Sequence, residues 1–248
     1  MVLIIIQARL GSTRLPGKVL RKAGGRELLD IQVERVKKTN CHDKIVIATS
    51  TLETDNPIED FCIARGIECF RGDEQDVLLR YYECAKNYKA DTIIRLTADC
   101  PLICSQTIDQ VHALHKEESS DYTANTVPWN KSTFPNGSDV EIFSFKTLER
   151  THELATKQQD REHVTFYMWQ NQDLFKTRQL KRNENLSNFR YTVDYPQDLQ
   201  VVDFVVKKLE AEGLEGTVKE ITDLIDSSEE IRKINEGISF EAGWGSSS

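Results

Sequence analysis

The chain has 248 residues, a length that suits one large α/β domain better than two full-sized domains. Hydrophobic residues make up 39% of it and charged residues 29%, which excludes a disordered, collagen-like or low-complexity chain. The 32 Lys and Arg against 40 Asp and Glu give a net charge of −8, so we expect no nonspecific binding to nucleic acid or an anionic membrane, and a polyanionic ligand needs a local basic pocket.

The first hundred residues alternate between aliphatic runs and segments with apolar residues at helical spacing. This alternation is typical of repeated βαβ units and predicts parallel strands. The predicted strands are Val2–Gln7, Lys44–Thr49, Ile67–Phe70 and Thr92–Leu96. Helices are predicted around residues 28–36 and 77–85, and a third begins at Asp55 or Asn56.

Beyond Leu114 the pattern changes, because residues 119–137 have little periodicity and two prolines. We interpret them as a long excursion, and we expect His112 and His115 just before it on one solvated helix face. Further strands are predicted near residues 139–143, 175–179 and 190–193, and helices near residues 145–154, 161–171 and in two apolar stripes after residue 199. The expected organisation is one domain, residues 1–240, with an insertion at 119–175 and a flexible tail at 241–248.

No run of residues reaches the length of about 20 that a membrane-spanning helix requires, and the N-terminus lacks the plan of a signal peptide. We therefore expect a cytoplasmic protein without a membrane partner. The six cysteines show no CxxC spacing, which favours reduced, partly buried thiols over a zinc site or disulfides.

The loop after the first predicted strand reads QARLGSTRLPGK over residues 7–18 and carries the strongest functional signal. Ligands of open parallel sheets bind beyond the carboxyl ends of the strands, where this loop lies. Gly11 allows a close backbone approach and a positive φ, while Arg9, Arg14 and Lys18 supply cations for phosphate oxygens. The spacing matches neither a P-loop nor a dinucleotide fingerprint. We expect a nucleoside triphosphate here, against the alternative of a simple turn with incidental basic residues.

Two acids are candidate metal ligands. Asp99 follows the fourth predicted strand and therefore lies at the same edge of the sheet as the loop. A carboxylate beside a triphosphate is repulsive unless a hard cation lies between them, and Mg²⁺ takes one or two carboxylates together with phosphate oxygens. Asp194 follows the strand predicted at residues 190–193 and is the second candidate, although its position equally suits a helix N-cap.

These residues resemble the cytidylyltransferases that make CMP-activated acidic sugars, and most closely the branch named for spore-coat polysaccharide biosynthesis protein F. The resemblance covers most of the chain. It is carried by five blocks in the same order, at residues 6–18, 95–103, 134–141, 161–165 and 191–194. It implies a Rossmann-like nucleotidyltransferase fold of the GT-A type, in three layers with a mostly parallel sheet. It also implies CTP as substrate, Mg²⁺ as cofactor, and a homodimer in which the excursion contacts the partner.

The resemblance assigns roles by position. The residues implied to hold CTP are Ala8, Arg9, Gly11, Ser12, Thr13, Arg14, Lys18, Thr97 and Ala98. Those implied in catalysis are Arg14, Lys18 and Asp99, and those implied to bind the metal are Asp99 and Asp194. Those implied to face the sugar are Asp139, Glu141 and His163. The chain departs from the pattern at Ala98, where the branch more often has Gly, and the sialic-acid enzymes have Pro and Gly in place of Gln7 and Leu10.

The expected activity is transfer of CMP from CTP to an acidic sugar of the 3-deoxy-2-keto type, with release of pyrophosphate, for surface polysaccharide or glycoconjugate synthesis. A sugar-phosphate nucleotidylyltransferase that uses another nucleoside triphosphate stays open as an alternative. So does a noncatalytic nucleotide-binding protein. A glycosyltransferase of similar fold normally has Asp-x-Asp after a strand, which Asp99-Cys100-Pro101 does not supply.

Overall fold

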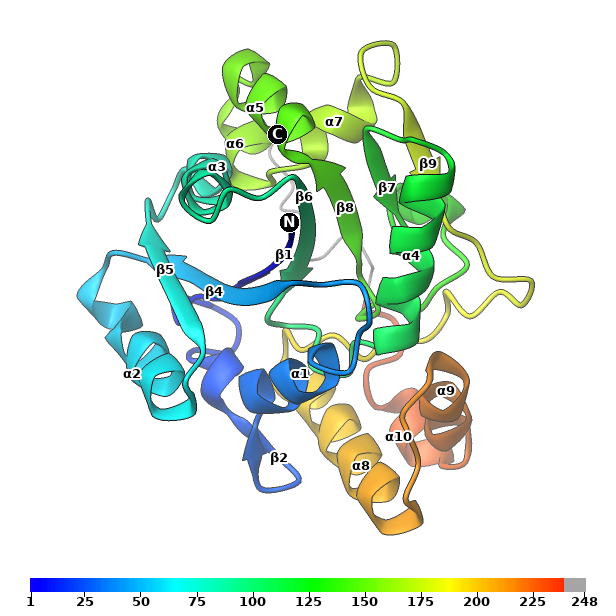
Figure 1. Ribbon diagram of the computed structural model, residues 1–248. Coiled ribbons are helices and arrows are strands. Elements are labelled where there is room, and N and C mark those ends of the chain that lie inside the picture. Colours follow the sequence, from blue (N-terminus) through cyan, green and yellow to red (C-terminus); the bar gives the residue numbers. More distant parts are fainter. Residues whose placement is uncertain (239–248) are drawn as a thin grey trace.

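The computed structural model describes residues 1–238, so the predicted tail at 241–248 lies outside the described residues. A seven-stranded sheet runs through the molecule in the order β5-β4-β1-β6-β8-β7-β9 (Figure 1). Its strands are β1 (Val2–Gln7), β4 (Lys44–Ser50), β5 (Glu68–Gly72), β6 (Thr92–Thr97), β7 (Tyr122–Ala124), β8 (Glu141–Ser144) and β9 (Thr177–Gln179).

The central strand β1 lies between β4 and β6, parallel to both. Residues 3–6 of β1 are fully buried, as expected for a parallel strand that is covered on both faces and reads as a continuous aliphatic run. Strand β8 runs antiparallel to β6, with Glu141 opposite Arg95. The start of β8 therefore lies at the edge of the sheet where β1 and β6 end.

Helices cover both faces of the sheet. One face packs against α1 (Leu28–Val36), α2 (Asn56–Arg65) and α4 (Ser105–Glu117). The other packs against α3 (Val77–Asn87), α5 (Phe145–Leu154) and α7 (Phe166–Gln170), and the short α6 (Gln158–Glu162) joins α5 to α7. This arrangement confirms the predicted α/β fold with a mostly parallel sheet.

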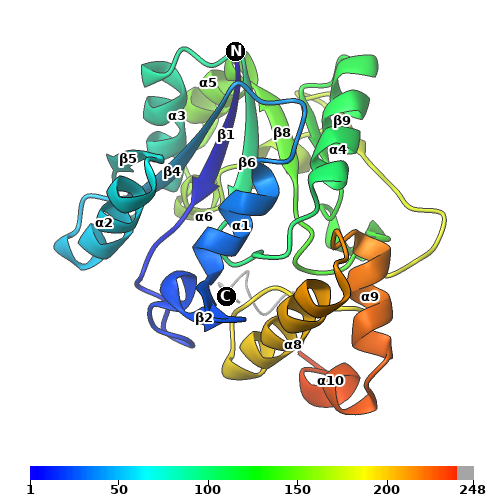
Figure 2. The same ribbon diagram turned by 60° about the horizontal axis from the view of Figure 1, so that its bottom comes forward.

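The C-terminal helices build a third apolar core. They are α8 (Pro196–Glu212), α9 (Val218–Asp226) and α10 (Glu229–Ile234), and they pack with α1 and with the segment around Tyr191. Figure 2 shows them in the half of the molecule toward which β1 points. A small hairpin of β2 (Lys22–Ala23) and β3 (Arg26–Glu27) contacts α8, where Gly24 donates its N–H to Asp203 at 2.9 Å. Three short 3-10 helices are η1 (Lys18–Leu20), η2 (Glu53–Asp55) and η3 (Trp129–Lys131).

Three predictions about elements are wrong. The excursion does not leave the sheet entirely, because β7 lies within it and pairs with β8 and β9. The helix predicted at residues 161–171 is two helices, separated where Val164 has a φ of 58°. Residues 190–193 form no regular strand, because the N–H groups of Tyr191 and Val193 instead bind the carbonyls of Asn136 and Asp99 at 2.8 Å each.

His115 also differs from the prediction of a solvated helix face. Its side chain is buried, and its Nδ1 lies 3.0 Å from Oγ1 of Thr123 in β7. The cysteines are free thiols, four of them buried, as the sequence predicted. Among the helices of residues 1–238, none combines the length and the apolar character needed to cross a membrane.

Candidate nucleotide and metal site

A cavity of about 340 Å³ opens beyond the carboxyl ends of β1 and β6. Nearly all of the site residues implied by the sequence line it. They are Arg9, Gly11, Ser12, Thr13, Arg14, Lys18, Thr97, Ala98, Asp99, Asp139, Glu141, His163 and Asp194. Of the fourteen sites named, Ala8 alone is not among the described lining residues. It is buried, and its N–H donates to the carbonyl of Ala48 at 3.0 Å.

The loop after β1 is held by its own backbone and by one distant carboxylate. The carbonyl of Leu10 accepts the N–H groups of Ser12 and Gly17 at 2.8 and 3.1 Å. The N–H of Leu10 donates to Oδ1 of Asp55 at 2.8 Å. The positive φ expected at Gly11 occurs at Gly17 instead, at 66°, immediately before η1, because Gly17 is where the chain turns back toward the sheet.

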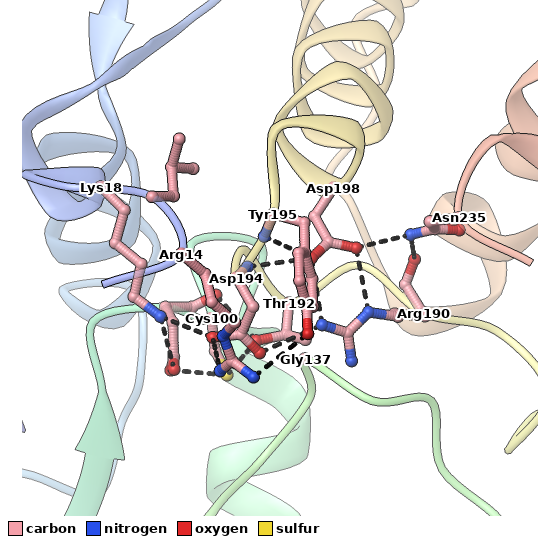
Figure 3. Close-up of polar contacts among 12 residues, drawn as sticks. Arg14, Lys18, Cys100, Gly137, Arg190, Thr192, Asp194, Tyr195, Asp198 and Asn235 are labelled. Carbon is pink, nitrogen blue, oxygen red and sulfur yellow. Dashed lines mark hydrogen bonds and ion pairs between the residues drawn. The ribbon is translucent and has the colours of Figure 1, made fainter. Parts of the chain in front are cut away.

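The first turn of η1 places Lys18 between the two candidate metal ligands. Its Nζ lies 3.2 Å from Oδ2 of Asp99 and 2.8 Å from Oδ1 of Asp194 (Figure 3). Arg14 reaches the same Oδ1 with Nη2 at 3.2 Å and lies 4.9 Å from the ring centroid of Tyr195. Two carboxylates from distant parts of the chain thus converge on one position for a cation.

Burial and charge set the protonation of this cluster. Burial by itself would lower the pKa of Lys18, but the negative charges of Asp99 and Asp194 outweigh it and raise that pKa. Burial would raise the pKa of Asp99, but the Lys18 ammonium and hydrogen bonds lower it to about 2. Lys18 is therefore charged and Asp99 ionised at neutral pH.

The cavity is not basic as a whole. Its described lining contains the cations Arg9, Arg14, Lys18 and Arg95 and the acids Asp99, Asp139, Glu141, Glu162 and Asp194. A triphosphate therefore needs an additional cation beside the two acids. Residues 1–238 hold no cluster of three or more His, Cys, Asp or Glu side chains suited to a metal. A pair of carboxylates is nonetheless the donor set that fits Mg²⁺ when phosphate oxygens complete its coordination.

On the acceptor side, the three predicted residues are held in different ways. Asp139 accepts hydrogen bonds from Oγ1 of Thr126 at 2.7 Å and from the N–H of Gly137 at 2.9 Å. Burial, with smaller contributions from the neighbouring acids, raises the pKa of Asp139. Glu141 forms an ion pair with Arg95 and accepts the hydroxyl of Thr165 at 2.6 Å.

His163 lies in the break between α6 and α7, at the wall of the cavity. Burial, the largest influence, lowers its pKa. The imidazole is therefore neutral at neutral pH. In that state it offers one hydrogen-bond donor and one acceptor.

Several residues that shape the site were not found from the sequence. Asp55 was considered only as a helix N-cap, yet its carboxylate holds the loop and also accepts the hydroxyl of Ser50 at 2.5 Å. Gln7 lines the cavity and accepts from Arg95 at 3.4 Å. Arg190 donates to Asp194 at 3.1 Å. No local pattern signals these contacts, because most of them join residues far apart in the chain.

Comparisons with known proteins agree with this geometry. The family model described as cytidylyltransferase matches residues 3–240. The chain is 36% identical over 214 residues to the spore coat polysaccharide biosynthesis protein SpsF of Bacillus subtilis, which spans 84% of this chain and 87% of the relative. A cytidylyltransferase structure from Leptospira borgpetersenii superposes with a TM-score of 0.83 at 30% identity, covering 96% of this chain and 98% of that one.

A CMP:2-keto-3-deoxy-manno-octonic acid synthetase complexed with CTP shares the fold. Its TM-score is 0.60 at 17% identity, and the match covers 86% of this chain and 99% of that chain.

Proposed function

Because this chain belongs to the cytidylyltransferase family, and is therefore a CTP-dependent nucleotidyltransferase, we propose that its acceptor is an acidic sugar of the 3-deoxy-2-keto type. The proposed reaction transfers CMP from CTP to a hydroxyl of that sugar, releases pyrophosphate and serves surface polysaccharide or glycoconjugate synthesis. The observation that carries the proposal is the position of Lys18 between the carboxylates of Asp99 and Asp194, beside the loop after β1. The names of the relatives support both the nucleotide and the sugar acid.

In the proposed reaction, the acceptor oxygen bonds to the α-phosphorus while the bond to the β-phosphate oxygen breaks. Pyrophosphate and one proton leave. Arg9, Arg14 and Lys18 neutralise the phosphate oxygens, because their cationic groups line the cavity at the end of β1. The arginine can grip two phosphate oxygens at once, whereas the lysine acts as a point charge.

We further propose that Asp99 and Asp194 hold Mg²⁺. The cation would bridge oxygens of the triphosphate and stabilise the charge that develops on the leaving pyrophosphate. Lys18 occupies the position between these acids and would then shift to a phosphate oxygen, a movement that its long flexible side chain allows. A divalent cation is consistent with one structure of the same fold, whose title names a complex with manganese.

The acceptor would bind on the side of the cavity formed by Asp139, Glu141 and His163. Because both oxygens of Glu141 are engaged by Arg95, Tyr122 and Thr165, this residue would act by orienting the Arg95 guanidinium. The arrangement we propose is one domain over residues 1–240, in which the insertion at 119–175 shapes the acceptor side. The same insertion would form the contact of a cytoplasmic homodimer.

The decisive experiment is pyrophosphate release measured across the four ribonucleoside triphosphates, each with a panel of 3-deoxy-2-keto sugar acids and sugar phosphates. Release with CTP and a sugar acid supports the proposal. Turnover confined to UTP with a sugar phosphate favours a sugar-phosphate nucleotidylyltransferase and overturns it. Binding of CTP without pyrophosphate release from any acceptor favours a noncatalytic nucleotide-binding protein.

A further inference from the structure

We propose that Arg190 is a positioning residue that fixes the orientation of the Asp194 carboxylate, and that Asp198 and Asn235 hold Arg190 in place. The inference rests on the proposed function, since it takes Asp194 to be a ligand of the divalent cation. It adds a set of residues that lies behind the cavity and that includes the end of α10. None of these three residues is among the site residues implied by the sequence.

The two oxygens of Asp194 face different surroundings. Oδ1 faces the cavity, where Lys18 and Arg14 approach it at 2.8 and 3.2 Å. Oδ2 faces inward and accepts from Nη2 of Arg190 at 3.1 Å (Figure 3). A carboxylate held through one oxygen cannot rotate freely about its last torsion. Arg190 therefore presents the other oxygen to the cavity.

Arg190 is itself fixed by a buried carboxylate. Its Nε and Nη2 donate to the two oxygens of Asp198 at 2.9 and 3.0 Å, a bidentate geometry that sets the plane of the guanidinium. The side chain of Asp198 is fully buried, and that of Arg190 is 8% exposed. One positive and one negative charge thus balance inside the protein. The negative charge of Asp194 is left to face the cavity.

The backbone around Asp194 depends on the same carboxylate. Oδ2 of Asp198 accepts the N–H groups of Asp194 and Tyr195, both at 2.9 Å. Asp198 thus ties the start of α8 to the candidate ligand, and a carboxylate in the first helical turn is also stabilised by the exposed N–H groups there. Asp198 therefore positions Asp194 twice, once through its backbone and once through Arg190.

Asn235 closes the network from the end of α10. Its Nδ2 donates to Oδ1 of Asp198 at 2.9 Å and to the carbonyl of Arg190 at 3.2 Å. In Figure 3 its side chain points from α10 toward both residues. Partners that orient metal ligands in this way typically contribute 10- to 100-fold in metal affinity when they are mutated.

The test measures Mn²⁺ binding to the full chain in the presence of CTP, from the electron paramagnetic resonance signal of free Mn²⁺. Arg190→Lys keeps the charge but loses the bidentate contact, and we expect its Kd for Mn²⁺ to rise by about tenfold or more. The KM for Mg²⁺ should rise in parallel, while kcat at saturating Mg²⁺ stays within about threefold of the parent. Thermal unfolding of each variant is measured alongside.

Two further variants keep the result interpretable. Asn235→Ala preserves both charges and should raise the Kd for Mn²⁺ by a few-fold, so it decides the matter if Arg190→Lys does not fold. Arg232→Lys is the matched control, because Arg232 pairs with Asp226 and lies over Phe189 without a contact to Asp194 in residues 1–238. Its Kd should equal that of the parent.

Three outcomes separate this inference from the proposed function. Weaker Mn²⁺ binding by folded Arg190→Lys or Asn235→Ala supports the positioning role. Parental binding by both, together with loss of binding by Asp194→Asn, overturns the positioning role and leaves the proposed function standing. Parental binding by Asp194→Asn overturns the metal assignment and the inference with it, while pyrophosphate release from CTP tests the reaction separately.

Discussion

The ammonium of Lys18 lies 2.8 Å from Oδ1 of Asp194, although 176 residues separate the two in the chain. Lys18 comes from the 3-10 turn that follows the first loop, and Asp194 comes from the segment that precedes α8. Their meeting defines the position where a nucleotide phosphate and a cation would be held together. The first two predictions address this position.

Lys18→Ala should lower the rate of pyrophosphate release by about 10²- to 10³-fold, because it removes one preorganised positive charge from the phosphates. The unfolding transition should remain cooperative. Lys22→Ala is the matched control, since the Lys22 side chain is 64% exposed and lies outside the described cavity lining. Equal rates for the two variants would contradict a catalytic role for Lys18.

Asp99→Asn should reduce turnover in Mg²⁺ by about 10²-fold or more, since it replaces a candidate ligand with a neutral group of the same shape. Steady-state rates over a range of Mg²⁺ concentrations check this, with the exposed Asp173→Asn as control. A rate near that of the parent at every concentration would refute the assignment of Asp99 to the metal.

Asp55→Ala should weaken CTP binding without touching the nucleotide. The carboxylate holds the N–H of Leu10 and the hydroxyl of Ser50, so its loss frees the loop and leaves buried donors unpaired. We expect a KM for CTP that is about tenfold higher and a free energy of unfolding about 2 kcal/mol lower. Asp60→Ala, on the exposed side of α2, should change neither quantity. Kinetics and urea titrations measure them.

Gly137→Ala should destabilise the protein more than Gly66→Ala. Both glycines have positive φ, at 108° and 62°, so each substitution strains the backbone by about 1–2 kcal/mol. A Cβ at Gly137 would in addition lie 2.4 Å from the backbone nitrogen of Thr192, whereas one at Gly66 meets open space. Urea unfolding of both variants gives the comparison. An equal loss would show that the close approach at Gly137 can relax.

His115 should make stability sensitive to acid. Burial and, to a smaller degree, His112 lower the pKa of His115 to about 4 in the folded chain, against 6.5 as the ordinary value. Between these values the unfolded chain takes up a proton and the folded chain does not. The free energy of unfolding therefore falls as the pH drops from 6.5, and the contribution of about 3 kcal/mol is lost by about pH 4.

Urea titrations of the parent and of His115→Gln from pH 8 to 4 isolate this effect, because every other titrating group is common to both proteins. The difference between their free energies of unfolding should shrink as the pH falls. A difference that stays constant over this range would exclude His115 as the source.

The first half of the fold could be predicted from the sequence, because strands buried on both faces are written as local aliphatic runs such as residues 2–7. Strand β7 has only three residues, and it forms because β8 and β9 lie beside it. Asp194 was expected at the end of a strand. It reaches the cavity without one, because Val193 binds the carbonyl of Asp99 at 2.8 Å.

The same division holds for the site. The loop at residues 7–18 and Asp99 each follow a strong strand signal, so their placement at one edge of the sheet could be predicted. The contact of Asn235 with Asp198 joins residues 37 positions apart, and that of Asp55 with Leu10 joins residues 45 apart. Pairings of this kind arise only when the chain has packed.

The antiparallel direction of β8 separates two kinds of variation in this protein. Asp139 and Glu141 enter the cavity from the loop before β8, while the loop after β1 enters it from parallel strands. Insertions or deletions at residues 126–138 would therefore reshape the acceptor side and leave the register of β1 with β4 and β6 intact. New acceptor preferences could thus be grafted by loop exchange onto an unchanged nucleotide-binding half.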